Sequence, residues 1–140
     1  MSGLTQVNSV KFCPSSFGLR LACCTAKGSL IIYTFKEGQW DKLTLKLEHA
    51  HQNSTNAVTW APSGHGLTAD PHAPVIATAS CDKSIKLFAI RDGIAGLIQM
   101  RLKSFVSSIT ISRTQSGTSI GYKTTSCNKT FLLHVELTNR

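Results

Sequence analysis

The chain has 140 residues and a formal net charge of +8, from fifteen Lys and Arg against seven Asp and Glu. No apolar stretch reaches the roughly 20 residues that a membrane-spanning helix needs. The few acidic residues are dispersed and do not suggest a carboxylate pair for acid-base catalysis. We expect reduced thiols in the cytosol or nucleus, because the cysteines are odd in number and come without a secretory context. They are Cys13, Cys23, Cys24, Cys81 and Cys127.

Short apolar segments separated by turn residues fill the first third of the chain. We predict strands over residues 7–12, 19–24 and 30–35. Between residues 40 and 47, Leu alternates with Lys and Thr, which is typical of an outer strand with one buried and one solvated face. Together these segments predict one four-stranded unit over residues 1–48.

The stretch from residue 49 to residue 90 reads as one complete repeat. His51 precedes a first strand that ends at Trp60 and Pro62. Apolar β-branched residues then mark two further strands, and Cys81-Asp82-Lys83-Ser84 makes a tight turn between them. This order of His, strand, strand, Asp turn and strand is the WD-repeat pattern, with Leu87-Phe88 at the position of an apolar residue and Trp.

Parts of this repeat recur on both sides. Residues 8–14 align with residues 56–62, 48 positions later, and residues 79–84 are echoed 46 positions later at 125–130. Propeller blades recur at about 40–45 residues. One blade cannot bury its own core and must stack on others. A ring needs roughly 4–8 blades, so the chain is a piece of a longer propeller, or two copies close a ring together, or the repeat pattern is misleading.

We therefore predict an all-β fold, a partial WD-repeat β-propeller with two clear blades and one degenerate blade. The predicted blades cover residues 1–48, 49–103 and 104–140. Within the second, residues 97–102 would form the outer strand. A helix would instead gather the apolar residues Ile94, Ile98, Leu102, Phe105 and Ile109 on one face. We favour the strand, because the repeat order requires one and Gly93 and Gly96 weaken a helix.

From Ser104 onward, Ser and Thr crowd the sequence. Strands over residues 106–112 and 131–137 are poorly marked, and Asn128 takes the place of the turn Asp. The sequence leaves open whether a third blade forms.

The sequence offers no convincing catalytic, cofactor or metal site. Gly117-Thr118-Ser119-Ile120-Gly121 matches the nucleophile-elbow pattern, but no apolar strand precedes it and no acid lies between Ser119 and His134. Cys23 and Cys24 would point to opposite faces of a strand, so they cannot converge on one ion with His49 or His51. We expect a protein that is not an enzyme.

One polar constellation has a structural reading. In WD repeats the His before the first strand hydrogen-bonds the Asp of the turn between the second and third strands. His51 and Asp82 occupy these positions, with Thr78 or Ser80 as the hydroxyl partner. Such a charge-assisted bond contributes about 1.5–3 kcal/mol. We call this predicted group the tether.

Several longer segments are more specific than the general WD-repeat pattern. They are residues 7–14, 18–24, 37–41, 50–51, 56–62 and 81–88. Together they resemble the SEC-thirteen family, the small WD-repeat subunit of the COPII outer coat that is shared with the nuclear pore scaffold. The resemblance runs from about residue 7 to residue 93. It implies a six-bladed open propeller that a partner closes by donating a blade, with this chain corresponding to the third and fourth repeats and a degenerate fifth.

This resemblance implies a non-catalytic scaffold in ER-to-Golgi vesicle transport and nuclear pore assembly. The expected partner is a blade-donating coat or nuclear-pore scaffold protein, with no small-molecule substrate and no direct nucleic acid. The expected location is cytoplasmic, at the ER membrane periphery in the COPII vesicle coat, and at the nuclear pore. The nuclear-pore paralogue is one alternative, and the net charge of +8 motivates another, a basic nucleic-acid-binding β domain.

Overall fold

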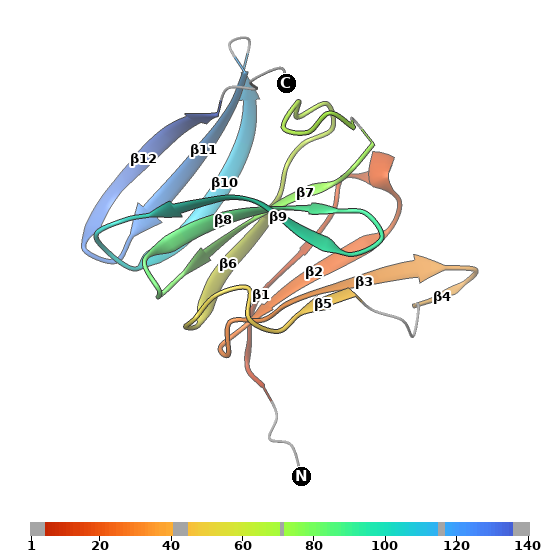
Figure 1. Cartoon of the computed structure of the whole chain (residues 1–140), viewed down its shortest axis with the longest axis horizontal. Helices are drawn as coiled ribbons and strands as arrows, with labels where there is room; N and C mark the ends of the chain where they lie inside the picture. Colours follow the sequence, from red (N-terminus) through yellow and green to blue (C-terminus); the bar gives the residue numbers. More distant parts are fainter. Residues whose placement is uncertain (1–4, 41–44, 71, 115–116, 136–140) are drawn as a thin grey trace.

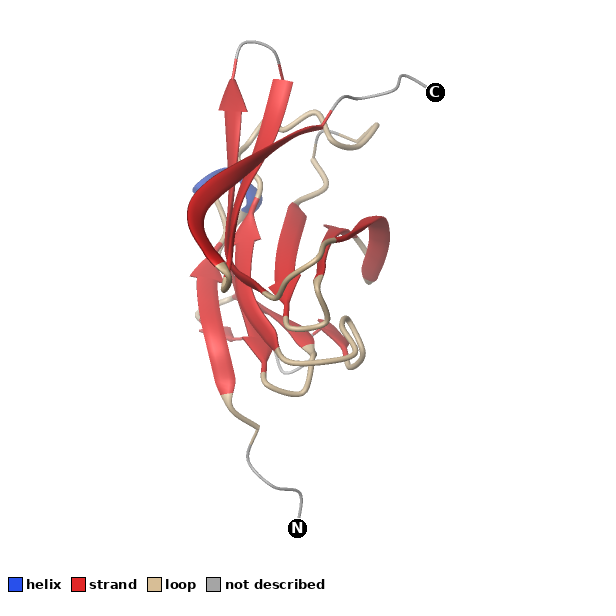
Figure 2. Ribbon diagram, turned by 90° about the vertical axis from the view of Figure 1, so that its left-hand side faces the viewer, coloured by secondary structure: helices blue, strands red, loops and turns tan. Residues whose placement is uncertain are grey.

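The computed structural model describes residues 5–40, 45–70, 72–114 and 117–135. Within these ranges the chain forms three antiparallel sheets that lie beside one another like the blades of a fan (Figure 1). The one helical element of the described chain is the short 3-10 turn η1 (Ser15–Phe17), visible among the strands in Figure 2. The all-β prediction is confirmed, and the architecture is that of a partial β-propeller.

Sheet 1 contains five strands in the order β1-β2-β3-β4, with β5 also paired to β3. Its strands are β1 (Val7–Phe12), β2 (Arg20–Thr25), β3 (Leu30–Lys36), β4 (Gln39–Trp40) and β5 (Leu45–Leu47). Glu37 and Gly38 both have positive φ, which is the geometry of a two-residue hairpin turn between β3 and β4. The outer strand predicted over residues 40–47 therefore appears as two short segments, and residues 41–44 lie outside the described residues.

Sheet 2 is the central repeat, with the strands in chain order. It consists of β6 (Thr55–Trp60), β7 (Val75–Ser80), β8 (Ser84–Ile90) and β9 (Ile94–Arg101). Strand β9 pairs with β8 from Ile90↔Ile94 to Ser84↔Arg101, with a register shift between Leu87 and Phe88. The alternative helix over this region is wrong, because residues 94–101 form a strand that pairs with β8 and Ile109 lies in the following strand β10 (Val106–Thr114).

Sheet 3 has three described strands in the order β10-β11-β12. They are β10 (Val106–Thr114), β11 (Gly117–Thr124) and β12 (Cys127–Val135). The uncertain third unit thus forms a sheet, and β11 is a strand that we did not anticipate. The aligned repeat placed a turn near Asn128, but the turn lies at Thr125 and Ser126, so β12 begins earlier than expected.

The core lies between the sheets, in two layers. One layer joins sheets 1 and 2 and includes Leu30, Ile32, Trp60, Ile76 and Phe88. The other layer joins sheets 2 and 3 and contains Val75, Ala77, Ala79, Ile85, Leu87, Val106, Ile109 and Ile120. Strand β7 is buried along its whole length because both of its faces are covered. Stacking of the sheets, and not any single sheet, therefore buries the apolar side chains.

Candidate functional site

A buried histidine joins the loop before β6 to the turn between β7 and β8. His51 Nδ1 lies 2.9 Å from Asp82 Oδ2, and His51 Nε2 lies 2.6 Å from Thr78 Oγ1. The His51 residue is only 1% exposed. Three predicted tether residues therefore meet in the described structure, with Thr78 as the hydroxyl partner.

Ser80 takes a different position in this group. Its hydroxyl donates to the Ser54 carbonyl oxygen at 2.8 Å and accepts from the Asp82 backbone N–H at 3.0 Å. It therefore holds the turn against the strand β6 side rather than contacting His51. The residue that sequence reasoning missed is Ser84, whose hydroxyl donates to Asp82 Oδ1 and lies 3.1 Å from His51 Nδ1.

Burial and hydrogen bonding set the charges of the pair. Burial lowers the pKa of His51, although the hydrogen bond to Asp82 acts in the opposite direction. Burial acts to raise the pKa of Asp82, but hydrogen bonds from Ser84 and His51 outweigh it and hold that pKa below its ordinary value. We assign a neutral imidazole whose Nδ1–H donates to the Asp82 carboxylate, while Nε2 accepts from the Thr78 hydroxyl.

The same loop also contacts sheet 1 and strand β8. The His51 backbone N–H donates to the Gly28 carbonyl oxygen at 3.0 Å, and Lys86 Nζ donates to the Ala50 carbonyl oxygen at 2.6 Å. Gly28 has a φ of +85°, and a Cβ there would lie 2.3 Å from the His51 carbonyl oxygen. The network therefore links two sheets, and it offers no exposed nucleophile.

The other sequence motifs lie in structural positions. Ser119 is inside strand β11, paired with Ser112 on one side and His134 on the other, so it does not occupy a strand-to-helix turn. Cys23 and Cys24 are buried neighbours in β2, and burial raises the pKa of Cys24 to about 12. Within the described residues no group of three or more His, Cys, Asp or Glu could hold a metal ion.

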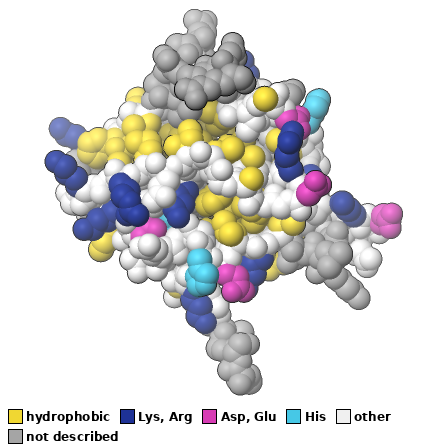
Figure 3. Space-filling view, in the orientation of Figure 1, with side chains coloured by type: hydrophobic (Ala, Val, Ile, Leu, Met, Phe, Trp, Pro, Cys, Tyr) yellow, Lys and Arg dark blue, Asp and Glu magenta, His cyan; other side chains and the backbone are white. Residues whose placement is uncertain are grey.

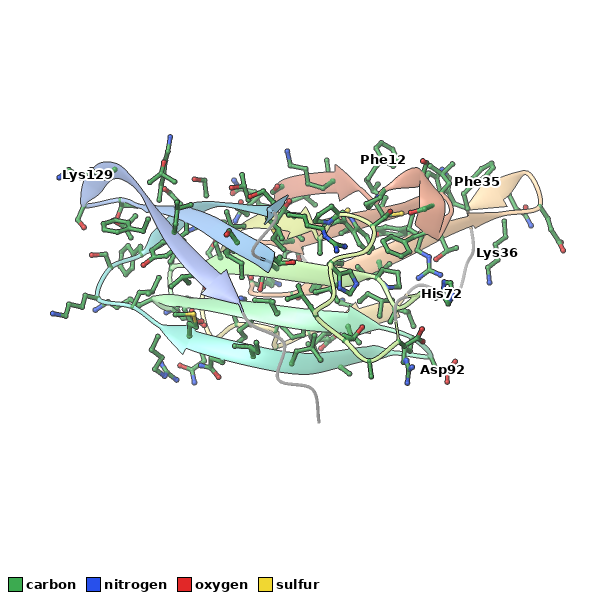
Figure 4. The ribbon with its side chains drawn as sticks, turned by 90° about the horizontal axis from the view of Figure 1, so that it is seen from above. Phe12, Phe35, Lys36, His72, Asp92 and Lys129 are labelled. Atoms are coloured by element: carbon green, nitrogen blue, oxygen red, sulfur yellow. The ribbon has the colours of Figure 1, made fainter. Side chains whose placement is uncertain are left out.

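The outer face of sheet 1 is apolar. In β2 and β3, Ala22 and Ile32 point toward sheet 2, so the alternate residues form the opposite face. That face carries Val10, Phe12, Leu21, Cys23, Ile31, Tyr33, Phe35 and Trp40, with Lys46 of β5 beside Ile31. Phe12 is 61% exposed, and its ring and that of Phe35 both lie against Trp40. Figure 4 shows Phe12 and Phe35 on the same side of sheet 1.

The outer face of sheet 3 is mostly polar. The side chains of Ile109 and Ile120 point toward sheet 2, so the alternate positions face outward. These outward positions include Ser108, Thr110, Ser112, Ser119, Gly121, Lys123, Thr130 and Leu132. A Cβ at Gly121 would meet Thr110, Thr130 and Leu132, which places all four on one face. Of the two end faces of the stack, the apolar one is therefore that of sheet 1.

No helix among the described residues is long and apolar enough to cross a membrane. No protein-family model matches the chain.

The chain is similar to proteins of two related kinds. It is 41% identical over 61 residues to "Protein SEC13 homolog" of Drosophila melanogaster, which covers 42% of this chain and 17% of that protein. It is 31% identical over 89 residues to "Protein transport protein SEC13" of Coccidioides immitis, and the match covers 59% of this chain and 28% of that protein. It is 37% identical over 84 residues to "Nucleoporin SEH1" of Bos taurus, and the match covers 57% of this chain and 21% of that protein.

The matched segments thus span less than a third of the length of these relatives. Repeat order, stacked antiparallel sheets and sequence similarity agree with one another, and the chain is therefore a partial β-propeller that is similar to SEC13 and SEH1 proteins.

Proposed function

We propose that the chain serves as a non-catalytic scaffold of the COPII coat type, in ER-to-Golgi transport and in nuclear pore assembly. The names of two of its relatives, a protein transport protein and a nucleoporin, support both settings. The buried tether contributes to stability and no chemistry, since the His51 ring is shielded from any substrate. The function of such a scaffold then depends on the surfaces through which it contacts other proteins.

The observation that carries this proposal is the outer face of sheet 1. Phe12 and Val10 are at least half exposed, and Trp40 is 41% exposed, on this apolar face. Such a contiguous apolar face is unusual on a monomer and marks a contact surface. Each internal interface of this chain already buries a face of this kind, so the occupant with the matching shape is another propeller blade.

The finer parts of the proposal concern partners and place. We expect the full assembly to contact a blade-donating coat or nuclear-pore protein, at the ER membrane periphery, in the cytoplasm and at the nuclear pore. The resemblance implies that the donated blade fits between the first and last blades of the family's propeller. These two blades correspond to repeats outside this chain. The chain by itself should therefore bind that partner weakly.

Co-expression with the remaining propeller repeats as a second polypeptide tests the proposal. We expect the chain alone to self-associate, and the pair to elute from size-exclusion chromatography as one soluble complex that recruits the blade-donating partner. Phe12→Ser should weaken the complex. Leu97→Ser, which changes a 39% exposed residue in β9 of the central sheet and on neither end face, is the matched control.

Two outcomes would argue against the scaffold. One is a monodisperse, stably folded monomer without added repeats. The other is tight binding to single-stranded RNA that weakens steeply with salt, which would favour the nucleic-acid-binding alternative.

A further inference from the structure

A pocket lies between the connection from β9 to β10 and the hairpin formed by β11 and β12. Its volume is about 400 Å³, which is within the range of small-molecule binding sites. One wall consists of residues 101–104, and the other carries Tyr122, Thr124, Ser126 and Phe131. None of these residues belongs to the tether or to the outer face of sheet 1. We name this site the β9–β12 pocket.

Hydrogen bonds hold the two walls of the pocket together. The hydroxyl oxygens of Ser104 and Ser126 lie 2.8 Å apart. The backbone N–H of Thr125, in the hairpin turn, donates to the Phe105 carbonyl oxygen at 3.0 Å. Both bonds join the β9–β10 connection to the turn between β11 and β12. The pocket is therefore largely preformed, so a ligand spends little of its binding free energy on ordering the walls.

The apolar part of the lining continues the core layer between sheets 2 and 3. Leu102 and Tyr122 are partly buried against that layer. The ring of Phe131 stacks on the ring of Tyr122, with centroids 5.3 Å apart and an angle of 21° between the two planes. Phe131 remains 38% exposed. A flat ring in the pocket can therefore stack on an aromatic side chain.

The polar part of the lining is positively charged and has no acidic partner. Arg101 and Lys103 are exposed, and no ion pair between described residues includes either of them. Residues 93–135 contain five Lys and Arg but no Asp or Glu. Lys and Arg side chains gather on the left of Figure 3, where β9 ends, and Figure 4 shows Lys129 at the same end of the molecule. This end of the molecule therefore attracts anions.

We propose that the β9–β12 pocket binds one nucleoside monophosphate. The phosphate group pairs with Arg101 and Lys103, and the planar base stacks on the exposed part of the Phe131 ring. The hydroxyls of Ser104 and Ser126 can donate to the phosphate or accept from the ribose. Inorganic phosphate matches only the two cations, and an uncharged aromatic compound matches only the rings. A nucleotide matches both parts of the lining at once.

This ligand site does not depend on the scaffold proposal. The scaffold proposal concerns whole blades stacked on the outer face of sheet 1, whereas the pocket lies between sheets 2 and 3. Each proposal can fail without the other, because one is tested by complex formation and the other by binding of a small molecule.

Equilibrium dialysis of the full chain tests the pocket, and it applies whether or not the chain self-associates. The probe is adenosine monophosphate (AMP), compared with adenosine, ribose phosphate, phenyl phosphate and inorganic phosphate. We expect one AMP bound per chain. Adenosine and ribose phosphate should bind about tenfold more weakly, because the first lacks the charge and the second lacks the base. Hydrogen exchange should show added protection around Ser104 and Ser126 when AMP binds.

Replacing the two cations tests the phosphate end of the pocket. The double variant Arg101→Gln with Lys103→Gln should weaken AMP by about tenfold and leave the affinity for adenosine unchanged. Lys11→Gln with Lys36→Gln removes the same charge from exposed residues of sheet 1 and should have a much smaller effect. All four side chains are exposed, so these variants should fold as the parent does.

Replacing the exposed ring tests the base end of the pocket. Phe131→Leu keeps an apolar side chain but removes the stacking surface, so it should weaken AMP by about tenfold and leave ribose phosphate unchanged. Phe12→Leu, at an exposed aromatic residue of sheet 1, should change neither affinity. If Phe131→Leu does not fold, the cation variant and hydrogen exchange still decide the question.

Several results would overturn the proposal. They are equal affinity for AMP and for adenosine or inorganic phosphate, unchanged AMP affinity after replacement of Arg101 and Lys103, and protection that appears away from the pocket. Equal affinity for phenyl phosphate would assign the pocket to a phosphorylated tyrosine side chain. A ten-nucleotide single-stranded RNA that binds much more tightly than AMP would assign this surface to nucleic acid. Either of these two results would overturn the proposal equally.

Discussion

Removing the Asp82 carboxylate measures what the tether contributes. In Asp82→Ala, His51 Nδ1–H loses the acceptor at 2.9 Å and the Ser84 backbone N–H loses the acceptor at 3.0 Å. The His51 residue is 1% exposed, and Ser84 Oγ at 3.1 Å is the nearest acceptor that remains for Nδ1–H. Losing the hydrogen bonds from these buried donors to a charged group costs about 1–3 kcal/mol. For a domain of this length, that corresponds to a fall of about 4–12 °C in Tm.

His51→Ala is the complementary change, because it leaves the Thr78 hydroxyl without its 2.6 Å partner. The double variant should lose less than the sum of the two single losses, with a coupling energy of about 0.5–3 kcal/mol. Urea denaturation of the four proteins gives this cycle. His72→Ala and Asp92→Ala, both exposed and labelled in Figure 4, are controls that should change stability by less than about 0.5 kcal/mol. Single variants that unfold at the parent's urea midpoint, or a coupling energy near zero, would refute the tether.

Three further predictions follow from the same contacts. Burial lowers the pKa of His51, so below the ordinary pKa of histidine the unfolded chain binds a proton that the folded chain does not. The urea midpoint should therefore fall as the pH drops below about 6.5. This dependence of the urea midpoint on pH should be weaker in His51→Gln. Gly28→Ala should destabilise the chain by more than Gly38→Ala, because both glycines have positive φ but only at Gly28 would the new Cβ meet backbone atoms; equal urea midpoints would contradict this. Thiol titration of the unfolded, unreduced chain should find five free cysteines, and a count of three or one would show a disulfide.

A strand of this chain can be predicted from the sequence where its buried positions form a clear pattern of apolar residues. The strands of sheets 1 and 2 were predictable because β-branched runs end at clear turn residues. Strand β9 was ambiguous because a bulge near Leu87 interrupts its alternation, and that broken period also fits one helical face. Strand β11 was missed because its outward positions carry Ser119 and Gly121, which leaves few apolar residues to reveal a period of two.

The tether shows the same limit at the level of single side chains. The WD pattern predicts His51 and Asp82, and the contacts of both agree with that pattern. Ser84 was not anticipated because it belongs to the strand that follows the turn, and only the fold brings its hydroxyl to the His51 ring. A signal was available, since Asp commonly accepts the backbone N–H two residues on in such a turn, as Asp82 does from Ser84 at 3.0 Å, and this brings the Ser84 hydroxyl to the same carboxylate.

The two end faces of the stack argue against a ring built from two copies of this chain. Such a ring would be heterologous, because the outer face of sheet 1 would have to meet the outer face of sheet 3. The first carries Phe12 and other apolar side chains, whereas the second carries hydroxyl groups such as those of Thr110 and Ser112. Burying these hydroxyls against aromatic rings would leave them without hydrogen-bond partners. A polar outer face is what a terminal, capping repeat presents to water. Stacking of a further apolar face is therefore favoured at sheet 1 and disfavoured at the outer face of sheet 3.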